Sequence, residues 1–173
     1  LNPAPVSSPA ALSVPGLELY TCLQHHGLLG RVVAPLIRRR SELKAQRTGP
    51  RDDADRRQLA LKWLLVTCFG YTGYRNARFG RIEAHEAICA WAREVMLEGI
   101  EAARADGWDV VHGIVDSLWI TDVSGRSNDE RAVAAQRLAE RLGAKTGIPL
   151  DVEGRYPVLA ILPRRSDGAG ALT

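Results

Sequence analysis

The stretch LKWLLVTCFGYTGYRNA, residues 61–77, organises the rest of the chain. It begins as a helix in which Lys62 stands among leucine and tryptophan, and it ends in an aromatic, glycine-rich turn from Phe69 to Tyr74. Because glycine permits backbone angles that a side chain resists, Gly70 and Gly73 predict that turn. A cation on a helix that stops there can reach an anionic ligand beside the turn. The alternative interpretation is a buried helix with a glycine stop at its C-terminus.

A basic segment before this stretch predicts the first arm of a helical hairpin. Apolar residues recur at helical spacing over residues 28–47, with Pro35 as a kink or a second start. A turn follows, and Asp52 or Asp53 can cap a second helix that runs to about Phe69. Two helices joined by so short a connection should lie antiparallel.

Cations of the two predicted helices can converge. Arg40, Lys44 and Arg47 stand at i, i+4 and i+7, so they share one face of the first helix. Lys62 on the second helix can then face Arg40 and Lys44. A local cluster of this kind suits phosphate groups. A solvated charged face is the alternative interpretation of the same basic residues.

A carboxylate is expected at the tip of a β-hairpin. A long helix is predicted over Glu83–Ala105, and residues 109–122 then predict a hairpin with Asp116 at or beside its turn. Aspartate is common in turns for structural reasons. Its functional interpretation is a carboxylate on a rigid rim, where a divalent metal can bind. Since one carboxylate is too few, partners must come from elsewhere.

Further acidic residues are predicted on a later strand. Ser127–Glu130 forms a capping box that starts a helix to about Lys145. Residues 150–156 and 158–162 are predicted to be two strands. Asp151 and Glu153 alternate on the first of them, so both should point to one face. We expect that face to lie near Asp116.

The composition indicates a globular intracellular protein. Its 173 residues are 46% hydrophobic and 25% charged, with a net charge of +3. Three widely separated cysteines form no disulfide framework, which favours a reducing compartment, the cytoplasm. No run of 18 apolar residues is present, so no membrane span or membrane partner is expected. Both ends of the chain suggest a piece of something longer.

The order of these features resembles the fingers and palm of a family B DNA polymerase. That family has a lysine helix KxxxNSxYG that continues as YxGYxxARF, and this chain reads KWLLVTCFG followed by YTGYRNARF. Its metal hairpin reads YxDTDS, and this chain has HGIVDS at residues 112–117. The resemblance covers about residues 27–162. The positions that carry it are Lys62, Gly70, Gly73, Tyr74, Ala77, Arg78, Phe79, Glu83, Glu86, Ala90, Trp91, Arg93 and Asp116.

The resemblance implies nucleotidyl transfer from dNTPs to a DNA primer, with Mg²⁺ in a two-metal site. It implies that Arg40, Lys44 and Lys62 contact the incoming triphosphate. Asp116 corresponds to the catalytic aspartate that binds both metals. Further roles implied in the same way are metal-site carboxylates, Asp151 and Glu153, and contacts to DNA or the base pair, Phe69, Gly70 and Tyr71. The implied partners are primer–template DNA, dNTPs and the remainder of the polymerase chain.

Several residues depart from the family pattern, including Thr67 in place of the serine. Ile114 and Val115 replace the first aspartate and the threonine of DTD, while Val66 and Phe69 replace an asparagine and a tyrosine. This degenerate motif is similar to a divergent archaeal branch of the family. Two functions stay open: a replication or repair polymerase segment with impaired catalysis, or a pseudo-polymerase that binds DNA or nucleotide as a structural or regulatory module. We expect these 173 residues alone not to polymerise.

The expected fold is α/β. The hairpin of Asp116 and the two later strands would form an antiparallel, incomplete ferredoxin-like palm sheet covered by helices, and the helical hairpin would project as fingers. The expected domains are a Pro-rich irregular lead-in, the fingers, the palm, and a loop or truncated tail. Their ranges are 1–26, 27–73, 74–163 and 164–173.

Overall fold

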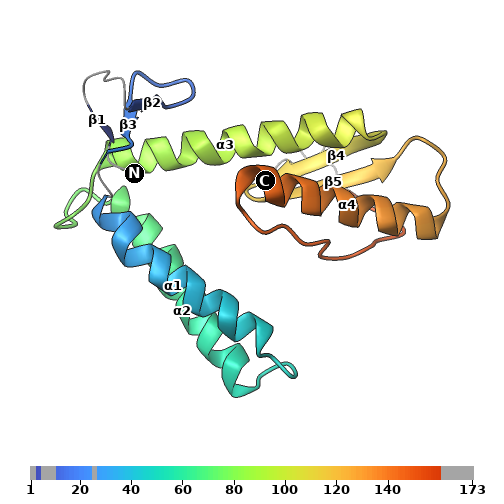
Figure 1. Cartoon of the computed structure of the whole chain (residues 1–173), viewed down its shortest axis with the longest axis horizontal. Coiled ribbons are helices and arrows are strands. Elements are labelled where there is room, and N and C mark those ends of the chain that lie inside the picture. Colours follow the sequence, from blue (N-terminus) through green and yellow to red (C-terminus); the bar gives the residue numbers. More distant parts are fainter. Residues whose placement is uncertain (1–2, 5–10, 25–26, 161–173) are drawn as a thin grey trace, which may run out of the picture. The chain divides into compact units, whose positions relative to one another are not determined.

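A computed structural model describes residues 3–4, 11–24 and 27–160 (Figure 1). The described residues form helices and small sheets, consistent with the predicted α/β class. They divide into two compact units, residues 1–101 with 112–118 and residues 102–111 with 119–173, and each is described by itself. The elements are β1 (Pro3–Ala4), β2 (Ala11–Ser13), β3 (Tyr20–Cys22), α1 (Leu28–Ala45), α2 (Asp53–Thr72), α3 (Ile82–Ala105), β4 (Trp108–Ile114), β5 (Ser117–Asp122) and α4 (Asn128–Thr146).

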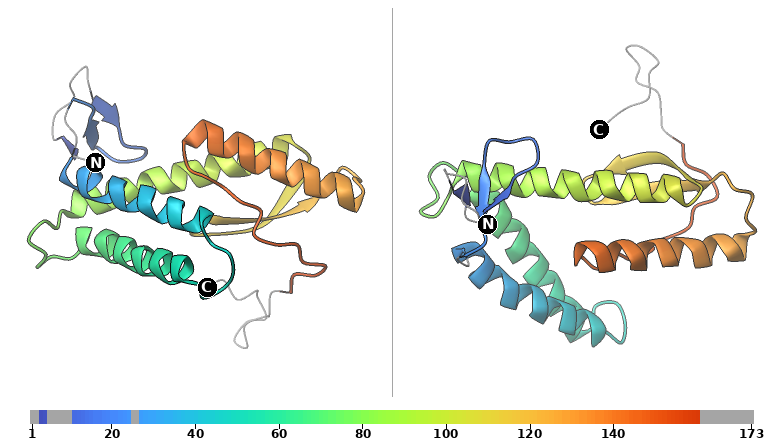
Figure 2. Two further views of the ribbon diagram at one scale, coloured as in Figure 1. Left: turned by 60° about the horizontal axis from the view of Figure 1, so that its bottom comes forward. Right: turned by 45° about the horizontal axis from the view of Figure 1, so that its top comes forward.

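The first unit contains the predicted helical hairpin. α1 runs through Pro35, and α1 and α2 lie side by side in both views of Figure 2. Asp52 caps α2 by accepting a hydrogen bond from the Asp55 N–H at 2.6 Å and another from the Thr48 N–H at 2.6 Å. These bonds hold the pKa of Asp52 at about 2. The cap and the hairpin are therefore as predicted.

The second helix of this hairpin continues beyond its predicted end. α2 runs to Thr72, so the turn expected from Phe69 begins one helical turn late. Gly70 is helical, and a Cβ there would meet nothing within 4 Å, so its predicted role in the turn is wrong. Gly73 ends the helix at φ −90°, a backbone angle that any residue type can adopt. A Cβ at Gly73 would lie 3.0 Å from the His85 ring, so a side chain there would have to displace that ring by a few tenths of an ångström.

Part of the predicted irregular lead-in forms a small sheet. β3 pairs antiparallel with both β1 and β2, in the order β1-β3-β2. The turn between β2 and β3 is closed by the Val14 N–H, which donates to the Leu19 carbonyl at 2.8 Å, and Gly16 supplies a φ of +68°. Val14 is fully buried against Ala87 and Ala90 of α3. This tertiary contact orders residues whose prolines predicted no regular structure.

The second unit has a core of its own. Trp108 of β4 and Leu138 and Leu142 of α4 pack with Ala103, at the end of α3. The Ser127 capping box starts α4 as predicted, and Gly147 ends it with φ +71°. Partly buried residues from both strands and from the chain after α4 complete this cluster: Val110, Ile120 and Leu150.

The two strands predicted after α4 are absent from residues 150–160, which lack regular structure. Gly154 and Pro157 interrupt the segment: glycine weakens a strand, and proline cannot donate a ladder hydrogen bond. Residues 151–160 are all exposed, so no buried face fixes a strand register. The predicted palm sheet is thus reduced to β4 and β5, and residues 161 and 162 lie outside the described part. Within that part, none of the helices has the length and apolar character needed to cross a membrane.

The Asp122 carboxylate is fully enclosed, so the stability of the second unit should depend on acid pH. The Ser124 hydroxyl and the Arg126 N–H donate to it at 2.7 and 2.8 Å, and with the charge of Arg126 they outweigh burial and lower the pKa of Asp122 to about 2. The unfolded pKa is about 3.9, so the stabilisation is full above that value and disappears as the pH falls through about 2.

We expect Asp122→Asn to be less stable at neutral pH and to take up about one proton fewer on unfolding between these pKa values. The melting temperature measured against pH checks this expectation. Asp109→Asn, at an exposed site on β4, is the control. If the melting temperature of Asp122→Asn falls with acid pH as steeply as that of the wild type, the expectation for Asp122 would be wrong.

Candidate functional site

The packing of α1 on α2 defines two sides of the hairpin. Leu43 of α1 is buried, and a shallow depression lies beside it. The depression is lined by Arg39, Leu43, Arg57, Ala60, Leu61 and Leu64. In antiparallel helices, residues displaced in the same rotational sense from the contact line emerge on the same side. Arg39 and Arg57 therefore mark one side of the hairpin.

The predicted cations occupy the other side. Arg40 and Lys44 are rotated from Leu43 in the opposite sense to Arg39, and Lys62 is rotated from Leu61 in the opposite sense to Arg57. We call Arg40, Lys44 and Lys62 the cationic stripe. Arg47 does not extend it, because α1 ends at Ala45 and Arg47 pairs with Asp55 at 3.0 Å.

The cationic stripe carries unbalanced positive charge. Among the described residues no ion pair involves Arg40, Lys44 or Lys62, although Arg39, Arg47, Arg56 and Arg57 of the same hairpin are all paired. Lys44 and Lys62 are exposed, while Arg40 is half-buried and its Nε atom is enclosed without a hydrogen-bond partner. Enclosure of Nε fixes the stem of this side chain. The stripe can therefore offer cations to an anion at little cost in broken contacts.

The aromatic residues near the end of α2 have unequal surroundings. The Phe69 ring stacks on His85 with centroids 4.5 Å apart, and the neighbouring Thr72 hydroxyl lies 3.0 Å from His85 Nδ1. Tyr71 is exposed and meets Tyr74 edge to face at 5.8 Å. His85 is thus a packing residue, and it anchors the end of α2 to α3. Among the residues predicted to contact DNA, Tyr71 is the more accessible ring.

Asp116 lies in the two-residue turn between β4 and β5, so its predicted position at the hairpin tip is confirmed. Its side chain is exposed, and the Ser117 hydroxyl is 3.5 Å from one of its carboxylate oxygens. Val115 beside it has φ +50°, which is uncommon for a β-branched residue. The strand pairing on both sides holds this strained turn, and the carboxylate points into open space rather than into the core.

The predicted metal ligands do not assemble within the described residues. Asp151 and Glu153 are exposed, in a segment that is anchored by Tyr156, whose ring lies 5.2 Å from that of Trp119. They belong to the second unit, and Asp116 belongs to the first. No group of three His, Cys, Asp or Glu side chains suited to a metal occurs in the part of the chain that the structure describes. Because Asp151 and Glu153 are not on a strand, the expected sharing of one strand face is wrong.

The sequence reasoning missed one polar cluster. Arg126 lies over the Trp108 ring, with its Cζ 5.1 Å from the centroid, and it pairs with Asp122 at 2.9 Å and donates to the Asp106 carbonyl. Arg141 pairs with Asp106 at 2.6 Å. The turn residues Asp122-Val-Ser-Gly-Arg126 carried a partial signal, since Asp and Ser there accept and donate local hydrogen bonds. Its contacts are internal, so we assign it to stability.

Comparison with known proteins identifies similar sequences. No family model matches the chain. It is 39% identical over 140 residues to DNA polymerase 2 of Saccharolobus solfataricus, which covers 80% of this chain and 20% of that protein. It is 26% identical over 145 residues to a DNA polymerase of Archaeoglobus fulgidus, covering 80% and 18%, and 32% identical over 102 residues to DNA polymerase 2 of Aeropyrum pernix, covering 59% and 12%. The predicted resemblance to DNA polymerases is confirmed, and the chain spans about a fifth of the length of these relatives or less.

Proposed function

We propose that this chain is the fingers and palm segment of a family B DNA polymerase that transfers nucleotides from dNTPs to a DNA primer with impaired catalysis. The observation that carries the proposal is the 39% identity with an archaeal DNA polymerase over most of the chain. The α1–α2 hairpin would be the fingers, and β4, β5 and the helices packed on them would be part of the palm. The activity and the partners, primer–template DNA and dNTPs, are proposed for the whole protein.

The cationic stripe supports a role in binding the incoming nucleotide. A triphosphate carries several negative charges over a few ångströms, and charge-assisted hydrogen bonds to it are roughly twice as strong as neutral ones. Arg40, Lys44 and Lys62 come from two helices that cap and packing hold in register, so the site is formed before the ligand arrives. Free of internal ion pairs among the described residues, they give up no salt bridge on binding.

The resemblance also implies Mg²⁺, which would organise the phosphates and the primer hydroxyl. Two-metal chemistry needs carboxylates that hold the ions about 4 Å apart. Asp116 can supply one such ligand from its exposed turn. The described residues do not fit a complete two-metal site, because no group of three ligands forms among them. The remaining carboxylates would come from the rest of the polymerase chain, with Asp151 and Glu153 as candidates.

A pseudo-polymerase that binds DNA or nucleotide without extending primers is the second candidate. It is favoured by the residues around the two predicted sites. Ile114 and Val115 leave the turn of Asp116 with a single carboxylate, and the 85% exposed side chain of Val115 offers no ligand atom to a metal. Val66, also exposed on α2, lacks the hydrogen-bonding groups of asparagine.

Removing the cationic stripe should abolish most nucleotide binding. We expect the full-length Arg40→Ala/Lys44→Ala/Lys62→Ala variant to bind dNTP about a hundredfold more weakly, since each hydrogen bond to a charged group contributes about 1.5–3 kcal/mol and the three are not additive. Isothermal titration calorimetry measures this. The matched control for the two α1 substitutions of this variant is Arg31→Ala/Arg38→Ala. Arg31 and Arg38 lie on the opposite face of α1 and likewise make no described ion pair. Wild-type dNTP affinity in the triple variant would show that these three cations do not form a nucleotide site in either candidate.

A further inference from the structure

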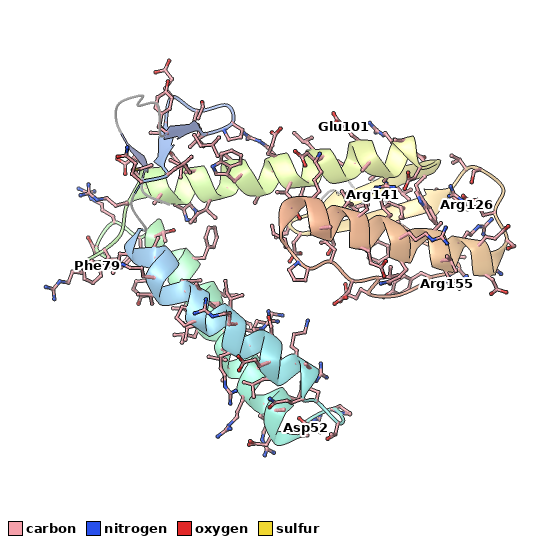
Figure 3. All side chains as sticks on the ribbon, in the orientation of Figure 1. Asp52, Phe79, Glu101, Arg126, Arg141 and Arg155 are labelled. Atoms are coloured by element: carbon pink, nitrogen blue, oxygen red, sulfur yellow. The ribbon has the colours of Figure 1, made fainter. Side chains whose placement is uncertain are left out.

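We propose that the loop between α2 and α3 binds single-stranded DNA, through aromatic rings that stack on bases and arginines that contact phosphates. The loop spans residues 73–81 and holds three arginines and no acidic residue. The inference rests on the proposed function, in which the ligand would be the unpaired template strand. Figure 3 shows Phe79 on this loop, with its side chain projecting from the ribbon.

The loop backbone is fixed before any ligand binds. Two successive turns are closed by the Ala77 N–H to the Tyr74 carbonyl and by the Gly80 N–H to the Ala77 carbonyl, both at 3.0 Å. The Arg81 N–H then donates to the Thr72 carbonyl of α2 at 2.8 Å. A Cβ at Gly80 would lie 2.5 Å from the Tyr74 carbonyl oxygen, so only glycine permits this compact path. A preformed loop loses little conformational entropy on binding.

Aromatic surface is exposed on and beside this loop. Phe79 is 66% exposed and Tyr74 52%, while Tyr71 at the end of α2 is 57% exposed. A shallow depression lies next to the loop, lined by Thr67, Gly70, Tyr71 and Tyr74. Exposed apolar surface gathered in one place marks an interaction site. Stacking of bases on such rings is tolerant of sequence, because every base has a flat face.

The arginines of the loop lack internal partners. Within the described ranges, Arg75, Arg78 and Arg81 make no ion pair. The Arg78 guanidinium carbon lies 5.5 Å from the centroid of the Phe79 ring, so a cation and an aromatic face are presented together. An acidic peptide would satisfy the arginines and leave the rings without flat partners. A single strand offers phosphates and base faces alternately, and double-stranded DNA hides those faces.

The test measures binding of a short fluorescent oligothymidylate and of a blunt duplex to the full-length protein by anisotropy. We expect Arg75→Gln/Arg78→Gln to weaken single-strand binding about tenfold and to reduce the slope of log K against log salt by about 1.4, at about 0.7 per lost phosphate contact. Phe79→Ala should weaken binding severalfold and leave that slope unchanged, because stacking releases no counterions. Duplex binding should stay at the wild-type level in both variants. Arg137→Gln, at an exposed site on α4, is the control.

Wild-type affinity of both variants for the oligonucleotide, or an equal loss for the duplex, would overturn the proposal. Circular dichroism of each variant guards against unfolding, and Phe79→Leu, which keeps apolar bulk but not the flat ring, separates stacking from packing. Measuring dNTP affinity in the same samples separates the two proposals. If the loop variants still bind the single strand while the cationic-stripe variant loses dNTP binding, the loop proposal alone would be wrong. If the loop variants lose single-strand binding and the wild-type protein binds no dNTP, the nucleotide site would be wrong and the loop proposal would be supported.

Discussion

Replacing Asp116 with alanine should reduce primer extension by the full-length protein by about a thousandfold or more, because it would remove the one carboxylate that the described turn offers to the metals. Asp116 is exposed and its described hydrogen bond is to the adjacent Ser117, so the substitution should leave stability unchanged within about 0.5 kcal/mol. The loss would therefore report on chemistry. Single-turnover primer extension with excess enzyme measures it.

The matched control for this experiment is Asp109→Ala. Asp109 is an exposed carboxylate on β4 of the same hairpin, so the Asp109→Ala variant should extend primers at the wild-type rate. Extension that disappears in Asp116→Ala alone would remove the pseudo-polymerase candidate. A wild-type protein that binds primer–template and dNTP but never extends would remove the polymerase candidate. Unchanged extension in Asp116→Ala would show that its assigned catalytic role is wrong.

Truncating Leu138 should cause a large loss of stability in the second unit. Leu138 is 4% exposed and packs with Ala103, Trp108 and Leu142, so Leu138→Ala would leave a cavity at the centre of this cluster. We expect a loss of about 2–5 kcal/mol in the free energy of unfolding. Urea denaturation followed by far-ultraviolet circular dichroism measures it.

Val133→Ala on the same helix is the control and also decides between two interpretations. The apolar spacing of residues 127–145 favours an inward position for Val133, whereas its side chain is 52% exposed in the structure. We therefore expect Val133→Ala to change stability by less than about 0.5 kcal/mol. A cost comparable to that of Leu138→Ala would mean that the spacing was right and that the described surface of α4 is covered.

The helices were predictable because their signals are local. Asp52 and Ser127 stand before apolar repeats, and each accepts the hydrogen bond from a backbone N–H three residues later that defines a cap. The hairpin turn at Asp116 followed from two β-branched runs around Val115-Asp116. For the candidate site, the spacing of Arg40 and Lys44 and the short connection to the helix of Lys62 were enough to predict a shared side of the hairpin.

The failures involve segments whose structure depends on distant residues. Asp151 and Glu153 alternate like strand residues, but a strand needs a neighbour to pair with, and residues 151–160 are exposed throughout. The end of α2 was misplaced because Gly70 was interpreted by its freedom, while the helix ends where Gly73 meets the ring of His85. The lead-in was predicted to be irregular because its prolines say nothing about Val14 and its contact with α3.

The sequence by itself determined the helical hairpin, the long helix, the turn of Asp116 and the resemblance to DNA polymerases, because caps, periodicity and motif spacing act over a few residues. Tertiary structure alone decided that Phe69 stacks on His85, that Arg40, Lys44 and Lys62 lack acidic partners among the described residues, and that the loop at residues 73–81 presents its arginines beside exposed rings. The physical reason is that burial and pairing depend on which surfaces meet, and residues far apart in the chain make those contacts.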